Sequence, residues 1–246
     1  MIKSSNPALK GTPFSGAGIF SGAETMTVQG TVTKSFFLVG LVMAVASVCW
    51  LQGQAHPDYL NPMVLAGTIC GFIIALITIW KKHWAPWTTS LYAIFEGVAL
   101  GSISLVFEKQ FSGIVFQAFL STMGTFIGLL IAYRSGLIKA TENFKLGVFA
   151  ATSGICLVYL ITIILNFFGL TVPYIHDNSI WGILFSLFVV VIAALNLVMD
   201  FDFIEQGEAV KAPKFMEWYA SFALLVTLVW LYLEILRLLA KSRSRR

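Results

Sequence analysis

The chain has 246 residues, of which 58% are hydrophobic and only 11% are charged, and its formal net charge is +4. At a mean hydropathy of +0.84, a water-soluble domain of this length would have too little polar surface. This composition excludes a soluble globular protein and indicates an integral membrane protein. The positive charge is no sign of a nucleic-acid partner. The basic residues flank apolar segments and are not interleaved with aromatic side chains, so no nucleic-acid partner is expected.

Seven apolar stretches are each long enough to cross a bilayer core of about 30 Å, which takes roughly 20 helical residues. They cover residues 35–53, 61–80, 87–107, 113–133, 146–170, 179–199 and 218–240. Because these stretches are continuously apolar, without the alternation of barrel strands, a β-barrel is disfavoured. The sequence therefore predicts an all-α integral membrane protein, a bundle of seven transmembrane helices in contact with the lipid bilayer.

The predicted organisation is one transmembrane domain with two flanking segments. Residues 1–33 lack the pattern of a signal peptide and are expected to form a flexible arm. The domain covers residues 34–240, and residues 241–246 form a basic tail. Glycines four residues apart lie on one helix face and favour close helix packing. Three such pairs occur, at Gly67 and Gly71, Gly97 and Gly101, and Gly124 and Gly128.

Loop charge predicts the orientation in the membrane. Ten Lys and Arg residues fall in the arm and in every second loop, whereas the alternate loops contain only Lys109. The positive-inside rule then places the N-terminus in the cytoplasm. The basic tail, from Arg237 onward, conflicts with this rule if the last segment crosses. Its length favours seven crossings, and a re-entrant last segment is the alternative.

Glu96 is the first candidate for chemistry, because it falls about 15 Å along its predicted helix, near the bilayer midplane. A charged carboxylate facing lipid there would cost about 3 kcal/mol, so Glu96 should face the bundle interior or a water-filled cavity. Since burial disfavours the charged form, such an acid can exchange protons or attract a passing cation. The plainer interpretation is a neutral acid that is hydrogen-bonded to another helix.

Three acids, Asp200, Asp202 and Glu205, follow the sixth apolar stretch and predict a cluster at the cytoplasmic end of that helix. Carboxylates at a helix C-terminus oppose the helix dipole, so a cation or a basic partner should lie nearby. Hard cations such as calcium prefer oxygen ligands of this kind. The alternative is a solvated polar cap, neutralised by Lys211 and Lys214.

Glu234 lies in the last apolar stretch, three residues before Arg237. This spacing suits an ion pair within one helix, so a structural role is preferred for Glu234 over a role in an ion pathway.

An enzyme is not expected from these residues. His56, His83 and His176 fall in loops on different sides of the membrane, so they cannot share one zinc ion, and the three cysteines show no metal spacing. No phosphate-binding or dinucleotide-binding loop is present, so no cofactor and no certain metal site is predicted.

Four segments in order resemble one family. They are SLYAIFEGVALGSIS around Glu96, RSGLIKATENFKLGV from Arg134, AALNLVMDFDFIEQG around Asp200, and APKFMEWYASFALLVTLVWLYLEILRLL from Ala212. Together they resemble the Bax inhibitor-1/YccA-like transmembrane family, in its bacterial branch, over residues 27–239. The resemblance implies a multi-pass protein of the cell (inner) membrane.

The resemblance also implies a pH-sensitive gate, in which aspartates of the sixth and seventh helices meet along a calcium leak path. Asp200 matches the first aspartate, but Thr227 stands where the family has the second. The next candidates to partner Asp200 are Asp202, Glu96 and Glu234. The family picture includes a basic latch at the end of the second helix, and Lys81 or Lys82 could provide it.

Two functions follow as expectations. The first is a pH-sensitive cation leak or channel, with calcium as the transported ion, gated by buried carboxylates. The alternative is a membrane regulator that does not transport and binds other membrane proteins in the control of proteolysis or stress. In that case the arm at residues 1–33 would matter more than the acids.

Overall fold

The computed structural model describes residues 24–169 and 179–245, so most of the arm, residues 1–23, lies outside the described residues. Apart from an isolated bridge between Thr25 and Pro213, the regular structure of these residues is helical, which confirms the predicted all-α class. Seven helices are long and apolar enough to cross a membrane. They are α1 (Val28–Ala55), α2 (Leu60–Trp80), α3 (Ala85–Gln110), α4 (Ile114–Arg134), α5 (Glu142–Phe167), α6 (Ile180–Ala209) and α7 (Met216–Ser244).

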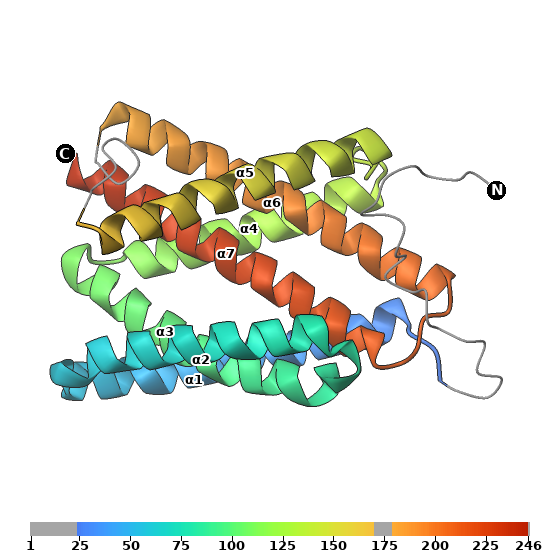
Figure 1. Ribbon diagram of the computed structural model, residues 1–246, viewed down its shortest axis with the longest axis horizontal. Helices are drawn as coiled ribbons and strands as arrows, with labels where there is room; N and C mark the ends of the chain where they lie inside the picture. Colours follow the sequence, from blue (N-terminus) through green and yellow to red (C-terminus); the bar gives the residue numbers. More distant parts are fainter. Residues whose placement is uncertain (1–23, 170–178, 246) are drawn as a thin grey trace.

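The helices run back and forth along the long axis of the molecule (Figure 1). We call the end at which α1 begins the N-terminal end of the bundle, and the end at which α7 finishes the C-terminal end. α7 is one continuous helix of 29 residues that joins these two ends. This geometry agrees with the prediction of seven crossings rather than a re-entrant last segment.

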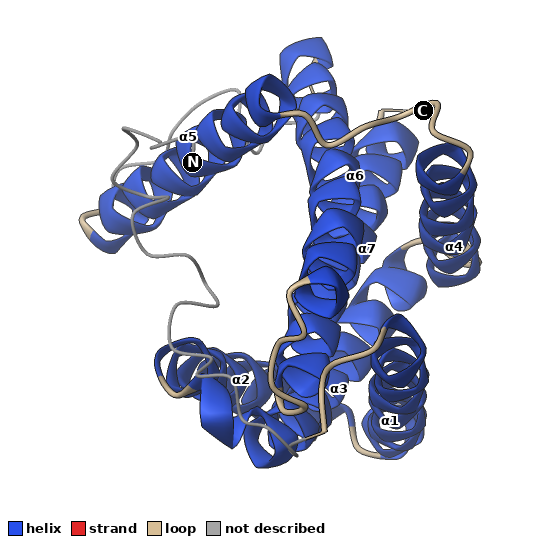
Figure 2. Ribbon diagram, turned by 90° about the vertical axis from the view of Figure 1, so that its right-hand side faces the viewer, coloured by secondary structure: helices blue, strands red, loops and turns tan. Residues whose placement is uncertain are grey.

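α7 is the central helix. It lies between the group α1, α2 and α3 and the group α4, α5 and α6 (Figure 2). The hydrophobic core correspondingly has two large clusters, and α7 contributes to both. Phe222 and Leu225 pack with Leu38 of α1 and neighbouring residues, while Leu231 packs with Leu197 of α6. A helix surrounded in this way can bury polar groups away from lipid, and α7 does so.

The glycine pairs pack as predicted at two of three places. A Cβ at Gly67 would lie 2.6 Å from the backbone nitrogen of Ala99, and one at Gly97 would lie 2.8 Å from Cβ of Val45. α3 therefore packs closely against both α2 and α1. The third prediction was wrong, because a Cβ at Gly124 or Gly128 would have nothing within 4 Å.

Every helix extends beyond its predicted limits at one end or both, and α1, α6 and α7 show the reason. α1 begins at Val28, where the Thr27 side chain caps it by accepting a hydrogen bond from Gly30 N at 3.0 Å. α6 continues ten residues past the predicted end at residue 199, to Ala209. α7 includes residues 241–244, which the sequence assigned to the tail. In each case polar residues that suggested a helix end have partners inside the bundle instead.

Candidate functional site

The interface between α6 and α7 holds the candidate site. These helices are antiparallel, and two polar contacts define their register. Asp200 of α6 lies beside Thr227 of α7. Fourteen residues away on each helix, the Lys241 ammonium donates a hydrogen bond to the Ser186 hydroxyl at 2.8 Å. The interface therefore has one polar contact in each half of the bundle, and hydrophobic core residues such as Leu197 and Leu231 lie between the two.

Asp200 lies about 14 Å along α6 from the N-terminal end, well inside the helix rather than at the predicted helix end. Its Oδ2 atom is inaccessible to solvent and has no hydrogen-bond partner among the described residues. The neighbouring Thr227 is also buried, and its hydroxyl donates to the carbonyl of Ala223 at 3.2 Å. A neutral hydroxyl group thus stands beside the carboxyl group of Asp200.

The three acids of α6 do not form one cluster, contrary to the sequence prediction. Asp202 forms an ion pair with Lys145 of α5 at 2.7 Å. Glu205 accepts a hydrogen bond from the Tyr133 hydroxyl of α4 at 2.7 Å. Asp202 and Glu205 are three residues apart, so they share one face of α6 and both line a pocket with Tyr133. Asp200 instead lies beside Thr227 of α7.

The prediction that Lys211 and Lys214 neutralise these acids was wrong for Lys214. Lys214 forms ion pairs with Glu217 at 3.2 Å and Glu24 at 3.8 Å. The partner of Asp202 is instead Lys145, which the sequence analysis did not name as a partner. Of the three acids, only Asp200 faces α7 without a cation beside it among the described residues.

Glu234 lies on α7 two turns beyond Thr227 and is 1% exposed. Its Oε1 accepts hydrogen bonds from Arg237 at 2.7 Å and from the Tyr159 hydroxyl of α5 at 2.9 Å. Arg237 also donates to the Tyr159 oxygen at 3.1 Å. The predicted pair of Glu234 and Arg237 is confirmed. The other carboxylate oxygen, Oε2, is buried without a hydrogen-bond partner in the described part of the chain.

Glu96 belongs to a different interface. It lies on α3, and a Cβ at Gly71 of α2 would be 3.3 Å from its Oε2 atom. The Tyr92 side chain, one turn earlier on α3, lies beside it. Glu96 is half-buried against α2, as expected for an acid turned away from lipid, whereas Asp200 belongs to the interface of α6 and α7.

The two candidate latch lysines both lie near aromatic rings. Lys81 Nζ is 5.4 Å from the ring centre of Trp84, and Lys82 Nζ is 5.3 Å from that of Tyr219 on α7. Contacts of this kind are cation–π interactions. Lys82 thus contacts the helix that carries Thr227, while a latch to Asp200 stays a prediction.

Sequence reasoning missed Glu217, which is 0% exposed at the start of α7. Its Oε1 accepts hydrogen bonds from both the backbone nitrogen and the hydroxyl of Thr27, each at 2.9 Å. Lys34 and Lys214 form ion pairs with the same carboxylate. The N-terminus of α1 further favours a negative charge. Glu217 therefore fixes α1 to α7, and the one signal for it was an acid opening the last apolar stretch.

No three His, Cys, Asp or Glu side chains lie together as a metal site within residues 24–169 and 179–245. The arrangement instead offers single carboxyl groups buried between helices, which can bind and release a proton or attract a cation in passage.

A comparison with known protein families shows the family of this chain. The sequence pattern of the family described as Bax inhibitor 1 like matches residues 6–244. The chain belongs to the Bax inhibitor 1 like family. This match covers all seven helices of this Bax inhibitor 1 like protein, from the arm to the last turn of α7. No curated protein matches the chain.

Proposed function

We propose that this protein is a pH-sensitive cation leak, with calcium as the transported ion, and that Asp200 is its gate. One observation carries the proposal. A carboxylate oxygen of Asp200 lies inside the membrane-spanning bundle, inaccessible to solvent and without a hydrogen-bond partner among the described residues.

The free-energy cost of this arrangement supports a functional role. Leaving a buried polar group without a hydrogen bond costs about 1–3 kcal/mol, and more for a charged group. Ionisable groups within membrane spans usually mark ion or proton pathways. When Asp200 is charged, it attracts a cation into the interface of α6 and α7, and when it binds a proton this attraction is lost. Permeation through such a path depends on pH.

The neighbouring carboxyl groups have different roles in this proposal. Asp202 is neutralised by Lys145, and Glu234 by Arg237. Asp200 is therefore the acid of this interface that binds a proton when the pH falls and attracts the cation when it is charged. Glu96, at the separate interface of α2 and α3, is a second candidate for a group that binds protons or cations. The protein is assigned no catalytic reaction.

The proposed orientation places the N-terminal end of the bundle in the cytoplasm and the protein in the inner cell membrane. Of the nine described Lys and Arg residues before Arg237, eight lie in the loops and nearby helix turns at that end, and only Lys109 lies at the other. Asp200 then lies closer to the cytoplasmic face, so cytoplasmic pH is expected to have the larger effect.

The test is calcium entry into liposomes that contain the purified protein and a calcium-sensitive dye. We expect entry above that of protein-free liposomes, and a clear change for Asp200→Asn. Asp202→Asn is the matched control, since it makes the same chemical change two residues away on α6, at an acid already paired with Lys145. It should leave calcium entry close to the wild-type level.

Absence of calcium entry for correctly folded protein would contradict the leak. The alternative would then be a membrane regulator that acts by binding other membrane proteins. Deleting residues 1–23 would distinguish the two, because the leak should survive this deletion and a regulator that binds through its arm should not.

A further inference from the structure

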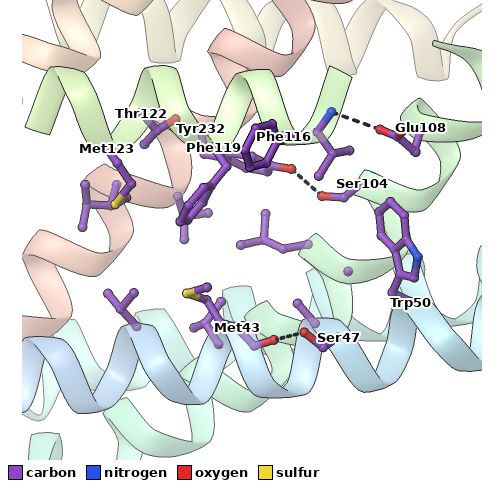
Figure 3. A pocket seen from close by; sticks show the side chains of 18 of the residues that line it. Met43, Ser47, Trp50, Ser104, Glu108, Phe116, Phe119, Thr122, Met123 and Tyr232 are labelled. Carbon is purple, nitrogen blue, oxygen red and sulfur yellow. Dashed lines mark hydrogen bonds between the residues drawn. The ribbon is translucent and has the colours of Figure 1, made fainter. Parts of the chain in front are cut away.

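A lateral groove of about 640 Å³ lies between α1 and α4, with α3 and α7 as its floor (Figure 3). Met43 and Leu51 of α1 and Phe116 of α4 line it and are 48%, 65% and 66% exposed. All four helices are membrane-spanning segments. The groove therefore opens sideways toward the lipid, away from the interface of α6 and α7.

The hydroxyl and carboxyl groups that line the groove already have partners. The hydroxyl groups of Ser104 and Tyr232 bond each other at 2.6 Å, and both Glu108 oxygens accept backbone hydrogen bonds from the start of α4. Ser47 and Thr122 donate to carbonyl groups of their own helices, each at 2.8 Å. Water in a cavity needs about two to four polar partners, and this lining offers few. The groove suits an apolar occupant.

Polarity changes along the groove. Trp50, Ser104 and Glu108 lie toward the C-terminal end of the bundle, whereas Val39 and Leu225 line the part nearer the middle. Tryptophan prefers the boundary between lipid and water. The groove thus has the same order of polarity as a phospholipid of the adjacent leaflet, with the polar region at the membrane surface and the apolar region toward the midplane.

We propose that this groove binds one acyl chain of a membrane phospholipid, with the headgroup at the C-terminal end of the bundle. The volume lies within the range of about 300–1,000 Å³ typical of small-molecule sites. A helix of another protein, about 10 Å across with its side chains, is a poorer fit to a groove of this volume. The bound chain would contact Leu225, Leu228 and Val229 of α7.

The experiment is native mass spectrometry of the full chain, released from nanodiscs made of equal amounts of palmitoyl-oleoyl phosphatidylglycerol and phosphatidylethanolamine. Ser47 is exposed at the groove, so Ser47→Trp can fill it without disturbing the core. Val48→Trp is the matched control, because Val48 is 58% exposed on the next position of α1 and does not line the groove.

We expect one phospholipid to remain on the wild type and on Val48→Trp after release from the nanodiscs, and about tenfold less on Ser47→Trp. Oleate should displace the retained lipid, whereas the phosphoglycerol headgroup alone should not. Val115→Trp, which enters the groove from α4, should repeat the loss if Ser47→Trp folds poorly. The proposal is overturned if the wild type retains no lipid, if both groove variants retain it fully, or if the retained mass is a second copy of the chain.

Discussion

Two acids, the buried Glu217 at the start of α7 and the half-buried Asp200 in the second half of α6, lie in opposite environments. Glu217 is fully buried and accepts hydrogen bonds or ion pairs from Thr27, Lys34 and Lys214. Asp200 has a buried oxygen with no partner among the described residues, and a neutral threonine beside it. Removing a buried acid whose partners are all present leaves those partners unpaired and destabilises the fold, whereas an acid with an unpartnered buried oxygen is a candidate for function.

The largest effect on stability is expected from Glu217→Gln. This change leaves Lys34 and Lys214 without their shared carboxylate, and breaking a buried ion pair typically costs about 3–5 kcal/mol. The free energy of unfolding in detergent micelles should fall by about 3 kcal/mol. Glu24→Gln is the control, because the Glu24 side chain is 82% exposed and its loss should change little. Equal stability of the two variants would contradict the structural role of Glu217.

A second test of the same contact is Gly30→Ala. A Cβ at Gly30 would overlap the Glu217 carboxylate, so either this carboxylate leaves its partners or α1 and α7 separate, at a cost of about 1–3 kcal/mol. Gly40→Ala lies on the same helix with nothing within 4 Å, and should instead stabilise α1 by about 0.5–1 kcal/mol. Thermal unfolding of both variants checks the expectation. If Gly40→Ala lowered stability as much as Gly30→Ala, the loss would come from an alanine in helix α1 and not from the contact with Glu217.

An intermediate effect is expected at Glu234, which has partners on only one of its oxygens. Glu234→Gln should lower the free energy of unfolding by about 1 kcal/mol, since Arg237 is partly exposed and can turn to solvent. A double-mutant cycle with Tyr159→Phe measures the coupling through the hydrogen bond at 2.9 Å. Strictly additive losses would mean that this hydrogen bond contributes nothing.

The smallest effect on stability is expected from Asp200→Asn. The neutral amide removes a buried charge that has no cation beside it, so the unfolding free energy should change by less than about 0.5 kcal/mol or rise. Unfolding of this variant beside Glu217→Gln measures the contrast directly. A loss as large as that for Glu217→Gln would show that Asp200 has a stabilising partner. It would contradict the difference in role between the two acids.

Much of the fold could be predicted because a helix in lipid must satisfy its own backbone, so length and composition alone indicate the spans. The pair of Glu234 and Arg237 was equally predictable, since it depends on spacing within one helix. The packing of Gly67 and Gly97 followed from the same kind of local pattern. Local spacing says nothing of which face meets a neighbour, and for that reason Gly124 and Gly128 were misjudged.

Contacts between distant segments could not be predicted in this way. Glu217 is bound by Thr27, 190 residues earlier in the chain, and no periodicity connects these positions. The same holds for the ion pair of Asp202 and Lys145, which lie on different helices. α6 continues through its acids because other helices supply their partners, so the composition of α6 alone gave a helix end too early.

The most direct test of the gate is the ratio of calcium entry at about pH 6 to that at about pH 8, measured in liposomes for the wild type and Asp200→Asn. If the proton acts on Asp200, the wild-type ratio differs clearly from one and the ratio for Asp200→Asn is close to one. A pH dependence that is unchanged in Asp200→Asn would contradict the assignment of Asp200 as the gate.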